Sequence, residues 1–123
     1  RAISSLQRAY SADKRLRGSN GGKIRKLLSR MLYKRGRRKK SQGNDSSAAR
    51  DFKRAYSYDR KNYAAANGLK FLRKKAKSLI EEGEVLIGLS NNEARKKLQQ
   101  AKRLLPSSDP LYKKVVELLA KTQ

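Results

Sequence analysis

A short pattern of small and large apolar residues occurs three times along the chain. Its copies begin at Ala2, Ala48 and Ala94, so each copy starts 46 residues after the one before (48 − 2 and 94 − 48). In every copy a large apolar residue follows the first alanine by four positions, and a second alanine follows three positions later. The large residues are Leu6, Phe52 and Leu98. These spacings place the three side chains on one face of a helix, so the pattern predicts three helices whose alanines admit a close neighbour.

Apolar residues recur at helical spacing in the intervening segments as well, and six helices are predicted in all. They span about 2–13, 23–42, 46–58, 62–88 and 92–105, with a last one that begins at Pro110. At about 1.5 Å per residue, the fourth would be roughly 40 Å long. The adjacent glycines in the segment 16–22 and the polar segments 43–47 and 90–92 predict turns. Asp109 and Pro110 suit the N-cap and first position of the last helix, which we expect to cover the end of the array.

A fixed period of this length is typical of helical repeat proteins, whose units bury their apolar faces against one another. With 123 residues, of which 37% are hydrophobic, the chain predicts one domain with a modest core. The chain opens with Arg1 inside a helical pattern and has no initial Met, so we expect a fragment of a longer protein.

Several classes of chemistry are disfavoured by composition. The chain has no Cys and no His, which removes disulfides, thiolate sites and the most common general base. Its one acidic cluster, Glu81, Glu82 and Glu84, is interpreted as a solvated helix end, and Gly21-Gly22-Lys23 lacks the spacing of a phosphate-binding loop. We therefore expect no catalytic residues, no cofactor and no metal. No apolar run approaches the roughly 20 residues of a membrane span, and we expect a cytoplasmic protein.

Charge is the strongest functional signal in the sequence. The formal net charge is +23, and it is graded along the chain. Residues 1–40 hold 15 Lys and Arg against Asp13 alone, residues 41–80 hold 10 against 3 acids, and residues 81–123 hold 8 against 6. Such a field should orient the chain toward an anionic partner.

Two rows of basic residues at helical spacing are the candidate partner-binding residues. The first row lies in the second predicted helix and consists of Lys23, Lys26, Arg30, Lys34, Arg37 and Arg38. The second row lies in the fourth and consists of Lys70, Arg73, Lys74 and Lys77. Either row alone is also what a solvated helix face would show, and the run Arg35–Lys40 extends the first.

Three kinds of anionic partner fit these rows. An acidic segment of a protein is the first, a nucleic acid bound through its phosphates without sequence preference is the second, and an anionic membrane surface ranks third. Tyr33, Tyr63 and Phe71 could stack on bases, whereas Tyr10 and Tyr56 recur in the repeat frame and are expected in the core. The sequence leaves the identity of the partner and the oligomeric state open.

The repeated pattern resembles the second helix of a tetratricopeptide repeat (TPR). Pro106 closes the third copy as in that family, and Gly36 and Gly43 lie where the family often has glycines. Two features differ from the family: the period is 46 instead of 34 residues, and the first-helix consensus is poor. The resemblance implies an all-α, TPR-like α-solenoid of antiparallel helix pairs with a C-terminal capping helix. It also implies a non-enzymatic scaffold that docks other proteins.

Overall fold

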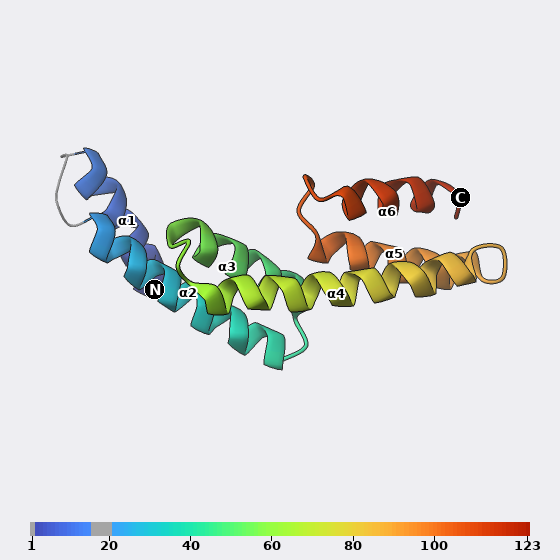
Figure 1. The fold of residues 1–123 in the computed structure, drawn as a ribbon, viewed down its shortest axis with the longest axis horizontal. Coiled ribbons are helices and arrows are strands. Elements are labelled where there is room, and N and C mark those ends of the chain that lie inside the picture. The colour runs from blue at the N-terminus through green and yellow to red at the C-terminus, as the bar shows by residue number, and fades with distance from the viewer. Residues whose placement is uncertain (1, 16–20) are drawn as a thin grey trace. The chain divides into compact units, whose positions relative to one another are not determined.

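The structure, a computed structural model, describes the backbone of residues 2–15 and 21–123 and the side chains of 2–11 and 21–123. In this part of the chain every regular element is an α-helix (Figure 1). The helices are α1 (Ala2–Arg15), α2 (Gly21–Ser41), α3 (Asp45–Tyr58), α4 (Tyr63–Leu86), α5 (Asn91–Leu104) and α6 (Pro110–Ala120). The all-α class predicted from the sequence is therefore confirmed.

The predicted helix limits agree with the observed ones to within two residues. The largest difference in interpretation concerns Gly21 and Gly22, which the sequence predicts as helix breakers and which instead form the first turn of α2. The first turn of a helix makes few intrahelical bonds through its N–H groups, so glycine there costs less than in the interior. Most of the predicted turn at 16–22 lies outside the described residues.

The helices group into two compact units, Arg1–Leu69 and Lys70–Gln123, with the boundary inside α4. The expectation of one domain stays a prediction. Among the described residues, none of the helices combines the length and the hydropathy needed to cross a bilayer.

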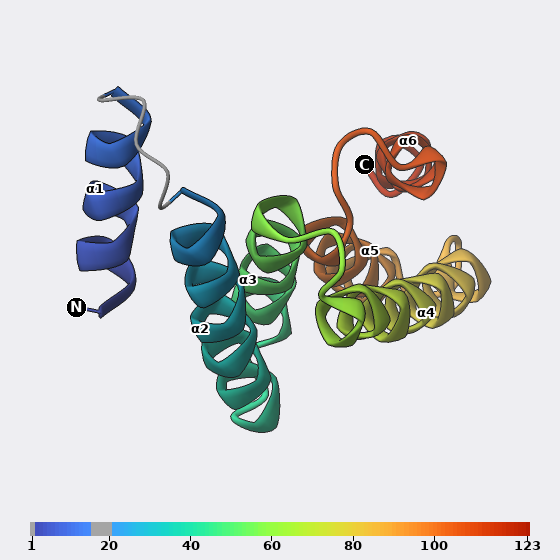
Figure 2. The same cartoon turned by 60° about the vertical axis from the view of Figure 1, so that its left-hand side comes forward.

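In the first unit, α2 and α3 run antiparallel and side by side (Figure 2). Two hydrogen bonds from α2 to α3 carbonyls fix this register. Ser29 Oγ donates to the Ala55 carbonyl oxygen at 2.6 Å, and Arg25 Nε donates to that of Tyr58 at 3.1 Å. Asn62 Nδ2 also donates to Ser29 Oγ, at 2.8 Å, so the buried hydroxyl both donates and accepts.

Phe52 is the centre of this packing, because a glycine lies close to its ring on each of two helices. A Cβ added to Gly36 of α2 would lie 2.9 Å from the ring, and one added to Gly68 of α4 would lie 2.8 Å from it. Phe52 is 2% exposed, and the bracketing Ala48 and Ala55 are fully buried. The predicted role of the second copy is therefore confirmed.

The first copy does not pack in the same way. Leu6 is only half-buried, and Ala2 and Ala9 are exposed, which corrects the expectation that all three copies fill a groove. A Cβ added to Gly22, which lies 46 residues before Gly68, would meet no described atom within 4 Å, so this glycine makes no close contact over Leu6. Sequence similarity at the anchors is therefore not sufficient to predict that the large residue is buried.

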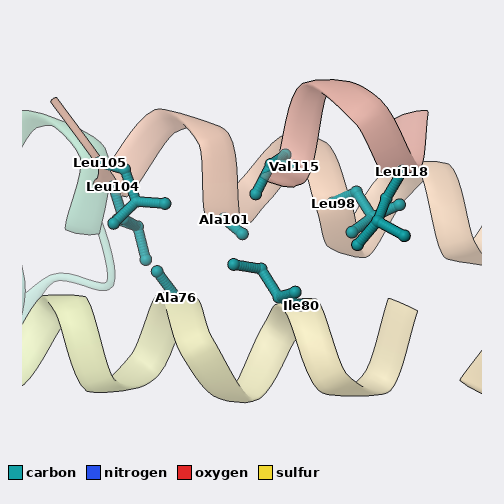
Figure 3. Close-up of a cluster of buried hydrophobic side chains, with 8 residues drawn as sticks. All are labelled: Ala76, Ile80, Leu98, Ala101, Leu104, Leu105, Val115 and Leu118. Atoms are coloured by element: carbon teal, nitrogen blue, oxygen red, sulfur yellow. The ribbon is translucent and has the colours of Figure 1, made fainter. Parts of the chain in front are cut away.

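In the second unit, α4, α5 and α6 share one apolar cluster (Figure 3). Ala76 and Ile80 of α4 point toward α5, where the third copy contributes Leu98 and Ala101, and Val115 adds a contact from α6. A Cβ on Gly83 would lie 2.8 Å from Leu98, so α4 again approaches through a glycine. The third copy therefore packs as predicted.

The start of α6 confirms the predicted cap. The Asp109 side chain accepts a hydrogen bond from the Leu111 backbone N–H at 2.9 Å, and Pro110 occupies the first turn. By contrast, Asn44 and Ser90 precede α3 and α5 without a side-chain capping bond.

Candidate functional site

The six predicted residues of α2 all lie at the surface. We call Lys23, Lys26, Arg30, Lys34, Arg37 and Arg38 the α2 basic row, and each of them is exposed. Within the described residues none of the six forms an ion pair, so their charge is directed to solvent. Leu27 lies in the same face, between Lys23 and Arg30, and is 44% exposed. The row thus combines uncompensated charge with an apolar contact point.

The four predicted residues of α4, called the α4 basic row, are Lys70, Arg73, Lys74 and Lys77, and they also lie at the surface. Arg73 differs from the others because its Nε and Nη2 donate to the two Asp109 carboxylate oxygens at 2.8 and 3.1 Å. This hydrogen-bonded pairing lowers the pKa of Asp109 and raises that of Arg73. Arg73 therefore holds the start of α6 to α4 in the second unit, a role that the sequence did not indicate.

The most distinctive charged group in the described chain is Asp51 of α3, which the sequence analysis did not select. Its side chain is 3% exposed and receives two hydrogen bonds from Arg35, from Nε and Nη2, each of 2.9 Å. Lys39 Nζ lies 3.3 Å from the second carboxylate oxygen. Burial alone would raise the pKa of Asp51, but the hydrogen bonds from Arg35 and Lys39 outweigh it and the pKa is lowered.

A signal for this group exists in the sequence. Asp51 follows Ala48 by three positions and precedes Ala55 by four, so it lies on the face that the repeat pattern buries. A carboxylate on a buried face needs cationic partners. Arg35 lies three positions after Leu32 and therefore also borders the buried face of its own helix.

Asp51 is one of the residues that line a pocket of about 440 Å³ between α2 and α3. Five cationic side chains and two serines line the rest of it. The cations are Arg35, Lys39, Arg50, Lys53 and Arg54. Five positive charges against one carboxylate leave the wall with a formal charge of +4 (5 − 1). None of these five belongs to the α2 or α4 basic row, although Arg35 and Lys39 lie in the run Arg35–Lys40 that extends the first row.

A second pocket, of about 450 Å³, lies in the other unit and has a different lining. Gln99, Lys102, Arg103 and Tyr112 surround it, and Lys102 Nζ lies 5.7 Å from the centre of the Tyr112 ring. Two cations and an aromatic ring make this pocket less positively charged than the one at Asp51.

The acidic cluster of α4 forms ion pairs with the neighbouring helices of its unit. Glu82 pairs with Lys97 at 3.1 Å and Glu84 with Lys114 at 3.0 Å, and both carboxylates remain substantially exposed, as a solvated helix end implies. In the part of the chain that the structure describes, no three His, Cys, Asp or Glu side chains come together as a metal site would need.

The aromatic candidates for base stacking separate into two groups. Tyr33 is half-buried and its ring centre lies 5.6 Å from that of Phe52, so it is part of the packing of the first unit. Tyr63 and Phe71 are 70% and 53% exposed. Tyr10 and Tyr56, expected in the core, are half-buried at its edge.

No protein family, curated protein or solved structure that was compared with the chain matches it. The tetratricopeptide resemblance therefore rests on the repeated pattern itself.

Proposed function

We propose that the chain is a non-enzymatic interaction module that binds an acidic segment of a partner protein through its basic surface. We further propose that its helices form TPR-like antiparallel pairs, with α6 as the capping helix. The antiparallel packing of α2 on α3 and the glycine contacts at Phe52 and Leu98 support such an arrangement. The expected cytoplasmic location stays a prediction.

The α2 basic row is the observation that carries the proposal. Exposed cations without an acidic neighbour attract an anionic partner and speed its association. The 44% exposed Leu27 among them offers an apolar contact, and interfaces between proteins combine such a contact with a charged rim. A partner helix with acidic residues around one apolar side chain would match this face.

Nucleic-acid binding is the second candidate, and the exposed rings of Tyr63 and Phe71 on α4 favour it. Phosphate contacts would use the same cations but have no use for Leu27. Because Tyr33 packs on Phe52, one of the three predicted stacking residues is engaged elsewhere.

Two probes distinguish the candidates on the full chain at about 150 mM salt. One is a 20-residue amphipathic helix-forming peptide of Glu and Leu, and the other is a 20-nucleotide single-stranded DNA. We expect the peptide to bind, and the triple variant K23Q/R30Q/K34Q to weaken it about tenfold or more, since each lost charge pair contributes some tenths to 1 kcal/mol. Leu27→Ser should weaken the peptide and leave the DNA unaffected.

The matched control is K96Q/K113Q/K121Q, which removes the same charge from lysines outside both basic rows. It should change peptide affinity less than threefold. Equal losses for the two triple variants would show that only net charge matters and would contradict the proposal. DNA binding that falls steeply with salt, together with no peptide binding, would establish the second candidate instead.

A further inference from the structure

The pocket between α2 and α3 has a wall made only of charged and hydroxyl side chains. The five cations come from both helices, and Asp51, Ser47 and Ser57 complete the lining. Small-molecule pockets are usually apolar with a few polar groups, and a nucleobase needs a flat apolar or aromatic surface. The aliphatic stems of the lysines and arginines supply most of the accessible surface of this pocket, but no aromatic ring lines it. Its five cationic groups therefore favour a compact anion.

Asp51 fixes the side chains of two of the cations, Arg35 and Lys39, before any ligand binds. Because both Nε and Nη2 of Arg35 donate to Asp51, the guanidinium is held in one orientation, and Lys39 is held to the same carboxylate. A donor whose side chain is already fixed loses less conformational entropy when a ligand binds. The buried carboxylate therefore lowers the formal charge of the pocket by one and orders two of its donors.

The remaining cations lie on α3 and lack an acidic partner. Among the described residues, Arg50, Lys53 and Arg54 form no ion pair, and all three are exposed. Arg50 Nη2 donates to Ser47 Oγ at 3.2 Å, which leaves the Ser47 hydroxyl hydrogen for another acceptor. Ser57 donates to the Arg54 carbonyl oxygen at 2.7 Å, so its hydroxyl hydrogen is already used.

We propose that this pocket binds a phosphate monoester dianion. A phosphate monoester carries a charge of about −1.5 to −2 and has three strong acceptor oxygens at neutral pH, whereas a carboxylate has one charge and two oxygens. A phosphate monoester therefore offers one acceptor oxygen for each of Arg50, Lys53 and Arg54, and it offsets more of the +4 lining than a carboxylate does. The group can come from a phosphorylated serine or threonine of a protein, or from free phosphate.

The third copy of the repeat lacks this set of charged side chains. The positions 46 residues after Lys53 and Arg54 are Gln99 and Gln100, and the position 46 after Asp51 is Lys97. The inference therefore concerns a feature of the second copy and not of the repeat in general. It also differs from the proposed function, because none of the five cations belongs to the α2 or α4 basic row.

The test is calorimetric titration of the full chain with a 12-residue phosphoserine peptide, the same peptide with Ser, and the same peptide with Glu. We expect the phosphopeptide to bind at least tenfold more tightly than either control peptide. Inorganic phosphate is titrated separately: if it binds and the phosphopeptide does not, the source is the free ion, and the assigned chemistry holds. Equal binding of all three peptides, with no binding of phosphate, would overturn the proposal.

The key variant is K53Q/R54Q, which introduces the residues that α5 has at Gln99 and Gln100. Both side chains are exposed, so the fold should be retained, and circular dichroism checks this. We expect about a tenfold loss of phosphopeptide affinity, and less than a threefold loss in the matched control K96Q/K113Q. Arg50→Gln is the second variant if K53Q/R54Q unfolds. Equal losses in pocket and control variants would contradict a defined site.

The Arg35 Nε–H signal in a ¹H–¹⁵N NMR spectrum gives a readout at the pocket itself, because this N–H donates to Asp51. It should shift when phosphate or phosphopeptide is added and should stay unshifted with the Ser peptide. An Arg35 signal that does not respond while binding occurs elsewhere would overturn the assignment to this pocket.

Discussion

The α2–α3 pair of the first unit and the α4–α5 pair of the second unit use one packing scheme. In each, a glycine of the first helix admits the large residue of the second: Gly36 faces Phe52, and Gly83 faces Leu98. The two alanines around each large residue are fully buried. Phe52 has a further glycine contact, at Gly68 of α4.

The two pairs differ in the charges beside this shared packing. In the first pair, Arg35 of α2 binds the buried Asp51 of α3. In the second, Glu82 of α4 binds Lys97 of α5, which lies 46 positions after Asp51, so the signs are reversed. The side chains of Lys97 and Glu82 are 42% and 53% exposed. The second and third copies therefore share the packing of their large residue, whereas the charged residues beside it differ.

The largest effect should come from removing the large residue of each copy. We expect Phe52→Ala to cost about 3–5 kcal/mol and Leu98→Ala about 2–5 kcal/mol, because both leave a cavity between close helices. Leu6→Ala should cost about 1 kcal/mol or less, since Leu6 is half-buried between exposed alanines. Urea unfolding measures all three. A Leu6→Ala cost similar to that of Leu98→Ala would remove the distinction between the copies.

The second largest difference in stability should come from removing one partner of the ion pair in each unit. Asp51→Ala leaves Arg35 and Lys39 without their acceptor, and we expect a loss of about 2–3 kcal/mol, below the range for fully buried pairs because Arg35 is 36% exposed. Lys97→Ala is the matched change in the other unit and should cost about 0–1 kcal/mol. Urea unfolding of both variants decides this, and equal costs would show that burial of Asp51 is unimportant.

Replacing a glycine by alanine should change stability less, and the sign of the change should depend on the position. Gly36→Ala places a Cβ 2.9 Å from the Phe52 ring, and we expect a net loss of about 1–2 kcal/mol after the gain in helix propensity. Gly22→Ala meets no described atom and should be neutral or stabilising by some tenths of a kcal/mol. Thermal unfolding followed by circular dichroism compares the two. Stabilisation by Gly36→Ala would contradict close approach at Phe52.

The pH dependence should be the smallest effect. Asp51 has a lowered pKa in the folded chain, so its contribution to stability is present above the ordinary carboxyl pKa of about 4 and is lost as the pH falls through the folded value. We expect urea midpoints to fall between about pH 5 and pH 2, and to fall less in Asp51→Asn. The same slope in both proteins would assign the acid sensitivity to other carboxyl groups.

Spacing alone is sufficient to predict the helices, because alanine and leucine periodicity, turn glycines and the Asp109–Pro110 cap are local signals. The surface position of both basic rows follows from the same periodicity. The looser packing of the first copy does not, because the burial of Leu6 depends on its tertiary neighbours. Rows of cations along a single helix do not reveal the pocket at Asp51, because Arg35 lies on α2 and Asp51 lies on α3.

The central claim is that the glycine contacts of Phe52 and Leu98, and not the repeated pattern by itself, anchor the helices. Native-state hydrogen exchange on the full chain tests it most directly. The amides of α3 and α5 around these two residues should exchange most slowly, and those of α1 around Leu6 about tenfold faster or more. Protection around Leu6 equal to that around Phe52 would contradict the claim.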